Sequence, residues 1–368
     1  MTSKQARTVV VIVTPAWADA NNGNWQTARR WARHLSAKHT VVLVDGWPQG
    51  RMQAVGASAA GLKAAQLQAL ASQAQAMIAL HARRSAASIQ AWHGHHGTPG
   101  LAVVLTGTDL YKDLPSPEPG IAQTVRGSLQ AAQRLVVLQD QASLDLPAAL
   151  RHKAQTVFQS TTTRRQLSKA DLGHSPLRAV MVGHLREEKD PRTLFGAAER
   201  LQLRAAGQTM PRGPGIRIDH LGAALDPALG AAAQATQAAC PLYRWLGGCT
   251  HEQARRRIQR AHVLVHTSRV EGGAHVIMEA LCSGTPVIAS RVAGNVGMLG
   301  ADYAGYFEVG DADGLAQALL RFQLDPDFRA ALQQQAQRRA TCFEPAREAQ
   351  ALQSLAQALV QAHQQQRK

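Results

Sequence analysis

One segment constrains the fold of this chain more than any other: AHVLVHTSRVEGGAHVIMEALCSGTPVIAS, from Ala261 to Ser290. The apolar runs Ala261–Ser268 and Thr285–Ser290 have the length and β-branched content of buried strands. Gly284 stands where a helix between them would stop. Because two strands joined by a crossover helix run parallel, the segment predicts a βαβ unit in a parallel sheet.

Runs of the same kind alternate with helical patterns along most of the chain, which is typical of α/β folds. Further strands are expected at Thr8–Thr14, His39–Asp45, Ala76–His81, Leu101–Leu105, Leu135–Leu138, Ala154–Gln159, Arg178–Val182, Ile216–Leu221 and Gly305–Val309. Helices are expected at Gly50–Leu70, Glu118–Ala132, Leu315–Phe322, Arg329–Arg339 and Ala346–His363. At 368 residues the chain exceeds one typical core. We therefore expect two doubly wound, Rossmann-like domains facing a cleft, residues 1–165 and 176–345, with a linker at Thr161–Ser175.

Two glutamates flank the turn and helix of the central segment. Glu271 lies in the turn beside Gly272 and Gly273, and Glu279 lies on the helix, one turn after His275. A carboxylate can accept hydrogen bonds from both hydroxyls of a ribose, and a second one beside bare backbone suits a sugar ring. A single glutamate is usually a solvated helix-end residue, but the double glycine and flanking strands favour a site.

The run SRVEGGAHVIMEALCSGTPVIAS resembles the E-x7-E region of GT-B glycosyltransferases of the family-four type, which use nucleotide-sugar donors. The resemblance implies that Glu279 binds the donor ribose and that Glu271 acts at the transferred sugar. It also implies that Gly272, Gly273, Ala274 and His275 surround that sugar, and that residues 346–368 form a helix crossing back to the first domain. Relatives of this type commonly retain the anomeric configuration, so retention is expected.

A second stretch, GHLREEKDPRTL, resembles the G-R-L-x-x-x-K motif whose arginine and lysine hold the donor diphosphate in such enzymes. Lys189 matches the lysine, whereas His184 stands where the arginine is expected. Either Arg186 substitutes for that arginine, or Lys189 and the backbone hold the diphosphate alone. Leu246, followed by Gly247, resembles the region that flanks the uracil.

The continuation RVAGNVGMLGADYAGYFEVGD, Arg291–Asp311, narrows the resemblance to the selenosugar synthases of selenoneine biosynthesis. That branch joins a sugar from a UDP-sugar, GlcNAc or glucose, to selenophosphate. The alternative within enzymes is a family-four-type glycosyltransferase acting on a sugar or lipid acceptor in polysaccharide synthesis.

Polar residues in the first domain follow several of the expected strands, where ligands bind in open α/β folds. After the first strand come Asn22, Gly23 and Asn24, which fit either a binding loop or a helix cap. We expect Asn22 and Gly23 at the acceptor and Asn24 among the catalytic residues.

Arg83 and Arg84 follow another strand and could clamp an oxyanion, although surface arginines are often only solvated. In the loop after Leu105 we expect catalytic roles for Thr108 and Asp109. Many family members carry a histidine in that loop, and this chain has Thr106 instead. An ionised acceptor such as selenophosphate needs no general base.

The amino-acid composition limits the classes of partner that this chain can bind. Forty Lys and Arg against 25 Asp and Glu give a formal net charge of +15, which favours anionic ligands. A non-catalytic nucleic-acid-binding or regulatory α/β protein is thus the alternative of another class, but no basic stripe interleaved with aromatic residues is present. We expect no nucleic acid partner and no integral membrane association, since no apolar run reaches about 18 residues. The sequence carries no signal for an oligomeric state.

The cysteines and histidines give no metal signature. The four cysteines lack a C-x-x-C pair, and His93, His95 and His96 fall in an expected surface turn without a carboxylate or cysteine pattern. We therefore expect no metal and no other cofactor, and the cysteine usage fits a reducing cytoplasm.

Overall fold

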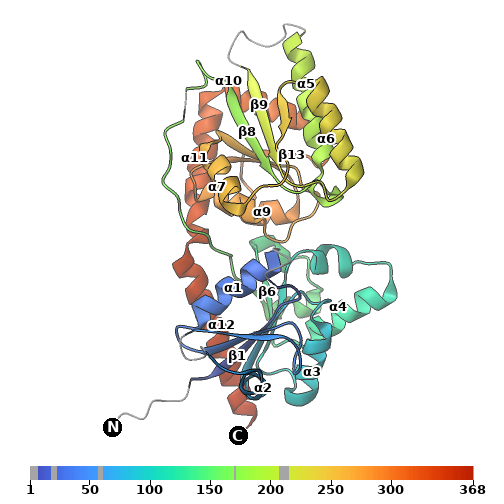
Figure 1. The fold of residues 1–368 in the computed structure, drawn as a ribbon, viewed down its shortest axis with the longest axis vertical. Coiled ribbons are helices and arrows are strands. Elements are labelled where there is room, and N and C mark those ends of the chain that lie inside the picture. Colours follow the sequence, from blue (N-terminus) through green and yellow to red (C-terminus); the bar gives the residue numbers. More distant parts are fainter. Residues whose placement is uncertain (1–6, 18–22, 57–60, 170, 207–214, 368) are drawn as a thin grey trace. The chain divides into compact units, whose positions relative to one another are not determined.

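The computed structural model describes residues 7–17, 23–56, 61–169, 171–206 and 215–367 (Figure 1). The chain forms two compact units: unit 1 is Met1–Gln159 with Pro345–Lys368, and unit 2 is Ser160–Glu344. Each unit is built on a largely parallel sheet with connecting helices, which confirms the expected α/β architecture. The expected linker has no helix or strand over residues 161–169, and it is held to unit 2 by the bond from Arg164 N to Cys282 O, 2.9 Å.

Unit 1 contains a seven-stranded sheet in the order β3-β2-β1-β4-β5-β6-β7. Its strands are β1 (Val9–Val13), β2 (Thr40–Val44), β3 (Met52–Val55), β4 (Ala76–Leu80), β5 (Leu101–Leu105), β6 (Arg134–Val137) and β7 (Ala154–Thr156). Its α-helices are α1 (Gly23–Leu35), α2 (Ala64–Ser72), α3 (Ala86–His96), α4 (Pro119–Ala131) and α12 (Pro345–Gln366). All neighbouring strands are parallel except β2 and β3, which pair antiparallel.

The central strands β1, β4 and β5 are apolar throughout because both faces of the sheet are covered there. Alternate residues of β1 enter different cores: Val9, Val11 and Val13 pack with residues of α2, α3 and α4, whereas Val10 and Ile12 pack with residues of α1 and α12. The C-terminal helix is therefore part of the hydrophobic core of unit 1.

Two local expectations in unit 1 are wrong. Residues 50–70 are not one helix: Met52–Val55 is the edge strand β3, and the helix begins only at Ala64. The register of β3 against β2 outweighs the helical preference of its Ala and Gln residues. The histidines 93, 95 and 96 do not form a surface turn but end α3, and the ring of His96 packs on Trp92 at 4.5 Å.

Unit 2 contains a six-stranded parallel sheet in the order β10-β9-β8-β11-β12-β13. Its strands are β8 (Leu177–Val182), β9 (Ile216–Leu221), β10 (Tyr243–Trp245), β11 (Val263–His266), β12 (Val287–Ser290) and β13 (Tyr306–Phe307). Its α-helices are α5 (Pro191–Ala206), α6 (Pro227–Ala239), α7 (His251–Arg260), α8 (His275–Leu281), α9 (Ala293–Leu299), α10 (Ala312–Leu324) and α11 (Pro326–Ala340). The central segment of the sequence is thus β11-α8-β12, as expected, and β11 pairs parallel with β12.

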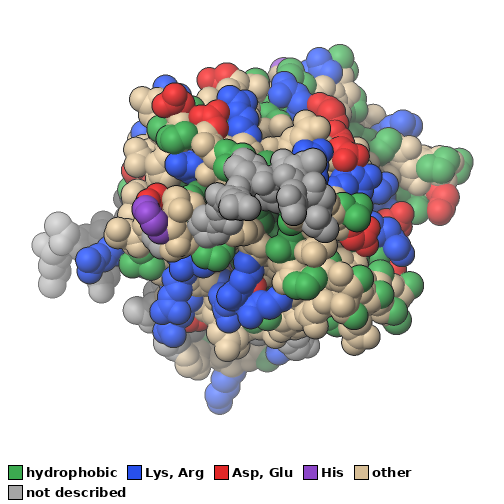
Figure 2. All heavy atoms as spheres, turned by 90° about the horizontal axis from the view of Figure 1, so that it is seen from above, with side chains coloured by type: hydrophobic (Ala, Val, Ile, Leu, Met, Phe, Trp, Pro, Cys, Tyr) green, Lys and Arg blue, Asp and Glu red, His purple; other side chains and the backbone are tan. Residues whose placement is uncertain are grey.

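The positive charge of the chain is distributed in groups on the surface. On the face drawn in Figure 2, Lys and Arg side chains lie in several separate groups, some with acidic side chains beside them. The four cysteines, at positions 240, 249, 282 and 342, are free thiols. Among the residues that the structure describes, none of the helices has both the length and the apolar character needed to span a membrane.

Candidate active site

The strand order of unit 2 reverses between β8 and β11, and the loops that leave the carboxyl ends of these two strands carry the polar residues. In open α/β sheets this switch point is where ligands bind, because the two loops diverge and leave a crevice. Lys189 ends the loop after β8, and Glu271 lies in the loop after β11. The topology therefore brings together two residues that are 82 positions apart.

Glu271, Lys189 and His266 form one hydrogen-bonded cluster. Lys189 Nζ donates to Glu271 Oε1, and His266 Nε2 donates to the same oxygen at 3.0 Å. The Lys189 and Glu271 side chains are only 15% and 10% exposed. Burial acts to raise the pKa of Glu271, but the charge of Lys189 and the bond from His266 outweigh it and hold the pKa well below its usual range. Burial also lowers the pKa of His266, which favours the neutral imidazole.

The turn that carries Glu271 is packed directly against α9. A Cβ atom added at Gly294, in the first turn of α9, would collide with the carbonyl oxygen of Glu271. Glycine is therefore required there for the close approach of helix and turn. Gly272 and Gly273 form the bend between Glu271 and α8, which begins at His275 after the buried residue Ala274.

Glu279 lies on α8, and its side chain is 5% exposed. His251, the first residue of α7, donates a hydrogen bond from Nε2 to Glu279 Oε1 at 2.6 Å. The His251 side chain is 70% exposed, so a buried carboxylate is covered by a histidine that can move into solvent. The hydrogen bond to Glu279 raises the pKa of His251 above its ordinary value.

The remaining expected donor residues lie in loops at the same edge of the unit 2 sheet. His184 Nδ1 accepts a hydrogen bond from the backbone N–H of Ala223 at 3.1 Å, which ties the loops after β8 and β9 together. Burial lowers the pKa of His184. Arg186 is exposed, and Leu246 directly follows β10 with 36% exposure.

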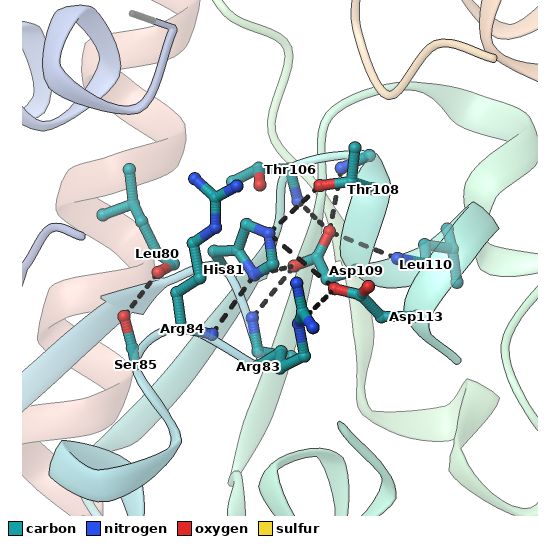
Figure 3. Close-up of polar contacts among 12 residues, drawn as sticks. Leu80, His81, Arg83, Arg84, Ser85, Thr106, Thr108, Asp109, Leu110 and Asp113 are labelled. Carbon is teal, nitrogen blue, oxygen red and sulfur yellow. Dashed lines mark hydrogen bonds and ion pairs between the residues drawn. The ribbon is translucent and has the colours of Figure 1, made fainter. Parts of the chain in front are cut away.

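In unit 1, the Asp109 carboxylate organises two loops at the carboxyl edge of the sheet (Figure 3). Its Oδ1 accepts the backbone N–H groups of Thr106, Gly107 and Leu110 at 2.9, 2.9 and 3.2 Å. Its Oδ2 accepts the N–H of Ala82, from the loop after β4, at 2.9 Å. The side chain is fully buried. These contacts fix the backbone of both loops through Asp109, and the catalytic role expected for this residue stays a prediction.

His81 is the residue that follows β4, and it adopts the left-handed backbone conformation, with φ +69°. Its ring points toward the loop after β5 (Figure 3). Nε2 lies 3.0 Å from Thr108 Oγ1, and the N–H of Arg84 donates to Nδ1 at 3.4 Å. Burial is the main cause that lowers the pKa of His81, with the charges of Arg84 and Arg83 acting in the same direction against Asp109 and Asp113.

The other residues expected at the acceptor differ in their surroundings. The Arg83 guanidinium forms an ion pair with Asp113 at 3.0 Å, and Arg84 is exposed. Gly23 and Asn24 begin α1, whereas Asn22 lies outside the described residues. The structure therefore groups Arg83 and Thr108 around His81, on two adjacent loops of the sheet edge.

Reasoning from the sequence missed three histidines: His81, His251 and His266. His81 is the last residue of the expected strand Ala76–His81, and His266 lies within the expected strand Ala261–Ser268, so the pattern assigns both to strands. Their position at the carboxyl end of a parallel strand was the available signal, because that edge binds ligands. His251 follows a helix cap, and no local pattern connects it with Glu279, 28 residues away.

Comparison with protein families finds a match that lies within unit 2. Residues 163–339 match the family described as glycosyl transferases group 1. At the level of sequence, no curated protein matches this chain.

Solved structures show the fold of the whole chain. It is similar to sucrose-phosphate synthase from Thermosynechococcus elongatus, at 16% identity and a TM-score of 0.69, with 96% of this chain and 98% of that chain covered. It is also similar to a glycosyltransferase from Rickettsia africae, at 14% identity and a TM-score of 0.70, with 96% and 99% covered.

The pneumococcal O-GlcNAc transferase GtfA, solved in complex with UDP and GlcNAc, matches at 16% identity and a TM-score of 0.58. That match covers 77% of this chain, which spans only 57% of the GtfA chain.

The family match includes Lys189, Glu271 and Glu279, and the first two solved structures each cover 96% of this chain. Residues 163–339 are therefore similar to the glycosyl transferases group 1 family, and the chain has the GT-B fold.

Proposed function

We propose that this protein is a glycosyltransferase that moves GlcNAc or glucose from a UDP-sugar to selenophosphate. The observation that carries the donor half is the Lys189–Glu271–His266 cluster at the switch point of unit 2, within the residues that match the family. The binding of UDP and GlcNAc by GtfA, which has the same fold, supports a UDP-sugar as the donor.

In this proposal the donor spans the loops after β8 and β11. Glu279 accepts hydrogen bonds from the ribose hydroxyls. Its carboxylate is buried, and the exposed histidine that donates to one of its oxygens can make way for the ribose. Lys189 turns from Glu271 to the diphosphate, assisted by Arg186. These cations neutralise the leaving UDP, so the reaction needs no resident metal.

Glu271, released from Lys189, faces the transferred sugar together with residues 272–275. A carboxylate there stabilises the positive charge that develops on the ring as the bond to UDP breaks. After Lys189 has turned away, the hydrogen bond that His266 donates to Glu271 still favours the ionised carboxylate. Leu246 provides an apolar contact for the uracil, and His184 holds the neighbouring loop.

The acceptor half rests on the chemistry of unit 1 and on the resemblance of Arg291–Asp311 to selenosugar synthases. Thr106 stands where many relatives have a histidine, and selenophosphate needs no base because it is already ionised. A lone pair on selenium forms the C1–Se bond as the C1–O bond breaks. UDP leaves with the electron pair of the broken C1–O bond. Water then cleaves the Se–P bond, which gives the 1-selenosugar and inorganic phosphate.

The test is an acceptor assay. The protein is mixed with UDP-GlcNAc or UDP-glucose and freshly made selenophosphate, and UDP and the selenosugar are measured by chromatography with mass detection. Inorganic phosphate in place of selenophosphate is the matched control. Release of UDP with a selenosugar is expected. Release of UDP only with sugar or lipid acceptors would overturn the assignment of selenophosphate as the acceptor and would favour a role in polysaccharide synthesis.

A second candidate, non-catalytic binding of nucleic acid, is favoured by one observation, the net charge of +15. It predicts polynucleotide binding that weakens steeply with salt and no turnover of any UDP-sugar. A salt titration with single-stranded DNA beside the acceptor assay separates the two functions.

A further inference from the structure

His81 is held in its unusual backbone conformation by contacts on every side. Its N–H continues the sheet by donating to Val104 O at 2.9 Å, and its carbonyl accepts the N–H of Ser85 at 3.0 Å. The Ser85 hydroxyl donates to Leu80 O at 2.6 Å. A non-glycine residue at positive φ is uncommon, and such residues concentrate at functional sites where the surroundings force the conformation. The effect here is that the imidazole is aimed at the loop after β5 (Figure 3).

The hydrogen bonds of the ring fix its proton. The N–H of Arg84 can only donate, so Nδ1 of His81 is the acceptor nitrogen. A neutral ring then carries its proton on Nε2 and donates it to Thr108 Oγ1. The ring is 2% exposed, so this bond is shielded from solvent on the histidine side.

The consequence lies in the hydroxyl of Thr108. When its oxygen accepts from His81, its own hydrogen must point elsewhere, and Thr108 is an exposed residue at the rim of the loop. The exposed Arg84 guanidinium follows His81 by three residues on the adjacent loop. The neighbouring carboxylates are engaged, Asp109 by backbone N–H groups and Asp113 by Arg83. The surface thus offers a directed donor and a cation.

We propose that His81 is a positioning residue that fixes Thr108 as a hydrogen-bond donor to the anionic oxygens of the acceptor. This rests on the proposed function for the acceptor, and it defines the class of group recognised as a phosphate-like dianion. His81 does not touch the acceptor. It sets the direction of the Thr108 hydrogen, while Arg84 supplies charge.

The test uses variants chosen for the backbone. His81→Gly removes the ring but adopts positive φ without strain, so the loop keeps its conformation. Thr108→Val removes the hydroxyl, and Thr108→Ser keeps it. We expect His81→Gly and Thr108→Val each to raise KM for selenophosphate about tenfold, with KM for the UDP-sugar unchanged, and Thr108→Ser to resemble the parent protein.

Two readouts separate positioning from simple support of the fold. The double variant His81→Gly/Thr108→Val should be no worse than Thr108→Val alone, because both changes remove the same donor. Added imidazole should restore part of the lost affinity in His81→Gly but none in the double variant. Additive effects, or equal loss of affinity for donor and acceptor, would overturn the proposal.

A measurement without turnover keeps this inference distinct from the proposed function. Nitrogen-15 NMR of the histidine rings should find His81 protonated on Nε2. A calorimetric titration with inorganic phosphate should give about tenfold weaker binding to His81→Gly than to the parent protein. Protonation on Nδ1, or equal phosphate affinity of the two proteins, refutes the role of His81 even if selenophosphate is the acceptor. Failure of every acceptor in the assay, with these two results as expected, refutes only the proposed function.

Discussion

At the scale of single residues, the two glutamates of unit 2 have different partners. Glu271 is bonded to a lysine and a histidine that are both well buried, whereas Glu279 is bonded to a histidine that is largely exposed. A ligand can therefore displace the partner of Glu279 at little cost. Displacing Lys189 from Glu271 requires an anion that compensates the lysine, which the donor diphosphate provides.

The pairing of His251 with Glu279 predicts a pH-dependent donor affinity. The raised pKa means that the free protein holds a protonated His251 on Glu279 below that pKa. A His251 displaced by the donor returns to its ordinary pKa, so donor binding releases the proton between the ordinary and the raised pKa. The Kd for UDP should therefore fall as pH rises through the pKa of His251. Calorimetry between pH 5.5 and 8.5 measures this Kd.

In His251→Ala this slope should flatten, and UDP should bind more tightly than to the parent protein at pH 6. His174→Ala is the control, because His174 is also exposed and paired with a carboxylate, Asp171. A slope that persists in His251→Ala would assign the titration to another group.

The difference between the two glutamates also predicts different kinetic defects. Glu271→Gln should lower kcat about 100-fold with little change in KM for the UDP-sugar, since its charge acts on the developing positive charge. Glu279→Ala should raise that KM at least tenfold with a smaller change in kcat. Steady-state kinetics at pH 7.5 distinguishes these outcomes, and full activity of both variants would show that the site lies elsewhere.

At the scale of elements, one buried carboxylate ties the loops after β4 and β5. Asp109→Ala would leave four backbone N–H groups without their acceptor, which should lower the free energy of unfolding of unit 1 by about 2–4 kcal/mol. Urea unfolding measures this loss in the free energy of unfolding. Glu118→Ala is the control, since Glu118 is exposed and makes no side-chain cap bond at the start of α4. Equal midpoints for both variants would contradict this role.

The same loops show what the sequence can predict. The β11-α8-β12 unit follows from apolar runs and one glycine, because strand and helix periodicity are local properties. The edge strand β3 was missed because its only support is pairing with β2. Lys189 and Glu271 were expected to act on one donor, yet the bond between them depends on the strand order. The role of Asp109 depends on where the loop after β4 passes, which no spacing in the sequence encodes.

At the scale of the whole molecule, the chain leaves unit 1 at Gln159 and re-enters it at Pro345. The return is held by a buried carboxylate as well as by apolar packing. Glu348 on α12 accepts from Trp31 Nε1 at 2.6 Å and from Arg30 Nε at 2.8 Å, both on α1. The family match ends at residue 339, before this helix begins, so α12 serves the fold of unit 1.

Because α12 belongs to unit 1 and the donor residues to unit 2, a destabilising substitution in α12 should leave donor binding unchanged. Leu355 is 1% exposed in the core shared with α1, and Leu355→Ala should lower the stability of unit 1 by about 3 kcal/mol. Tryptophan fluorescence reports this unit, because five of the six tryptophans lie in it: Trp17, Trp25, Trp31, Trp47 and Trp92. Leu324→Ala on α10, where the leucine is 51% exposed, is the control.

The Kd for UDP, measured by calorimetry at 15 °C where both units of the variant remain folded, should be the same in Leu355→Ala and the parent protein. The reason is that every donor residue proposed here, from His184 to Glu279, lies in unit 2, whose sheet and core are complete without α12. A tenfold rise in Kd would mean that unit 1 supplies part of the nucleotide site. The melting transition of unit 1, followed by tryptophan fluorescence, should move to lower temperature in Leu355→Ala. UDP should still raise the transition of unit 2, followed by scanning calorimetry, since a ligand stabilises only the unit that binds it.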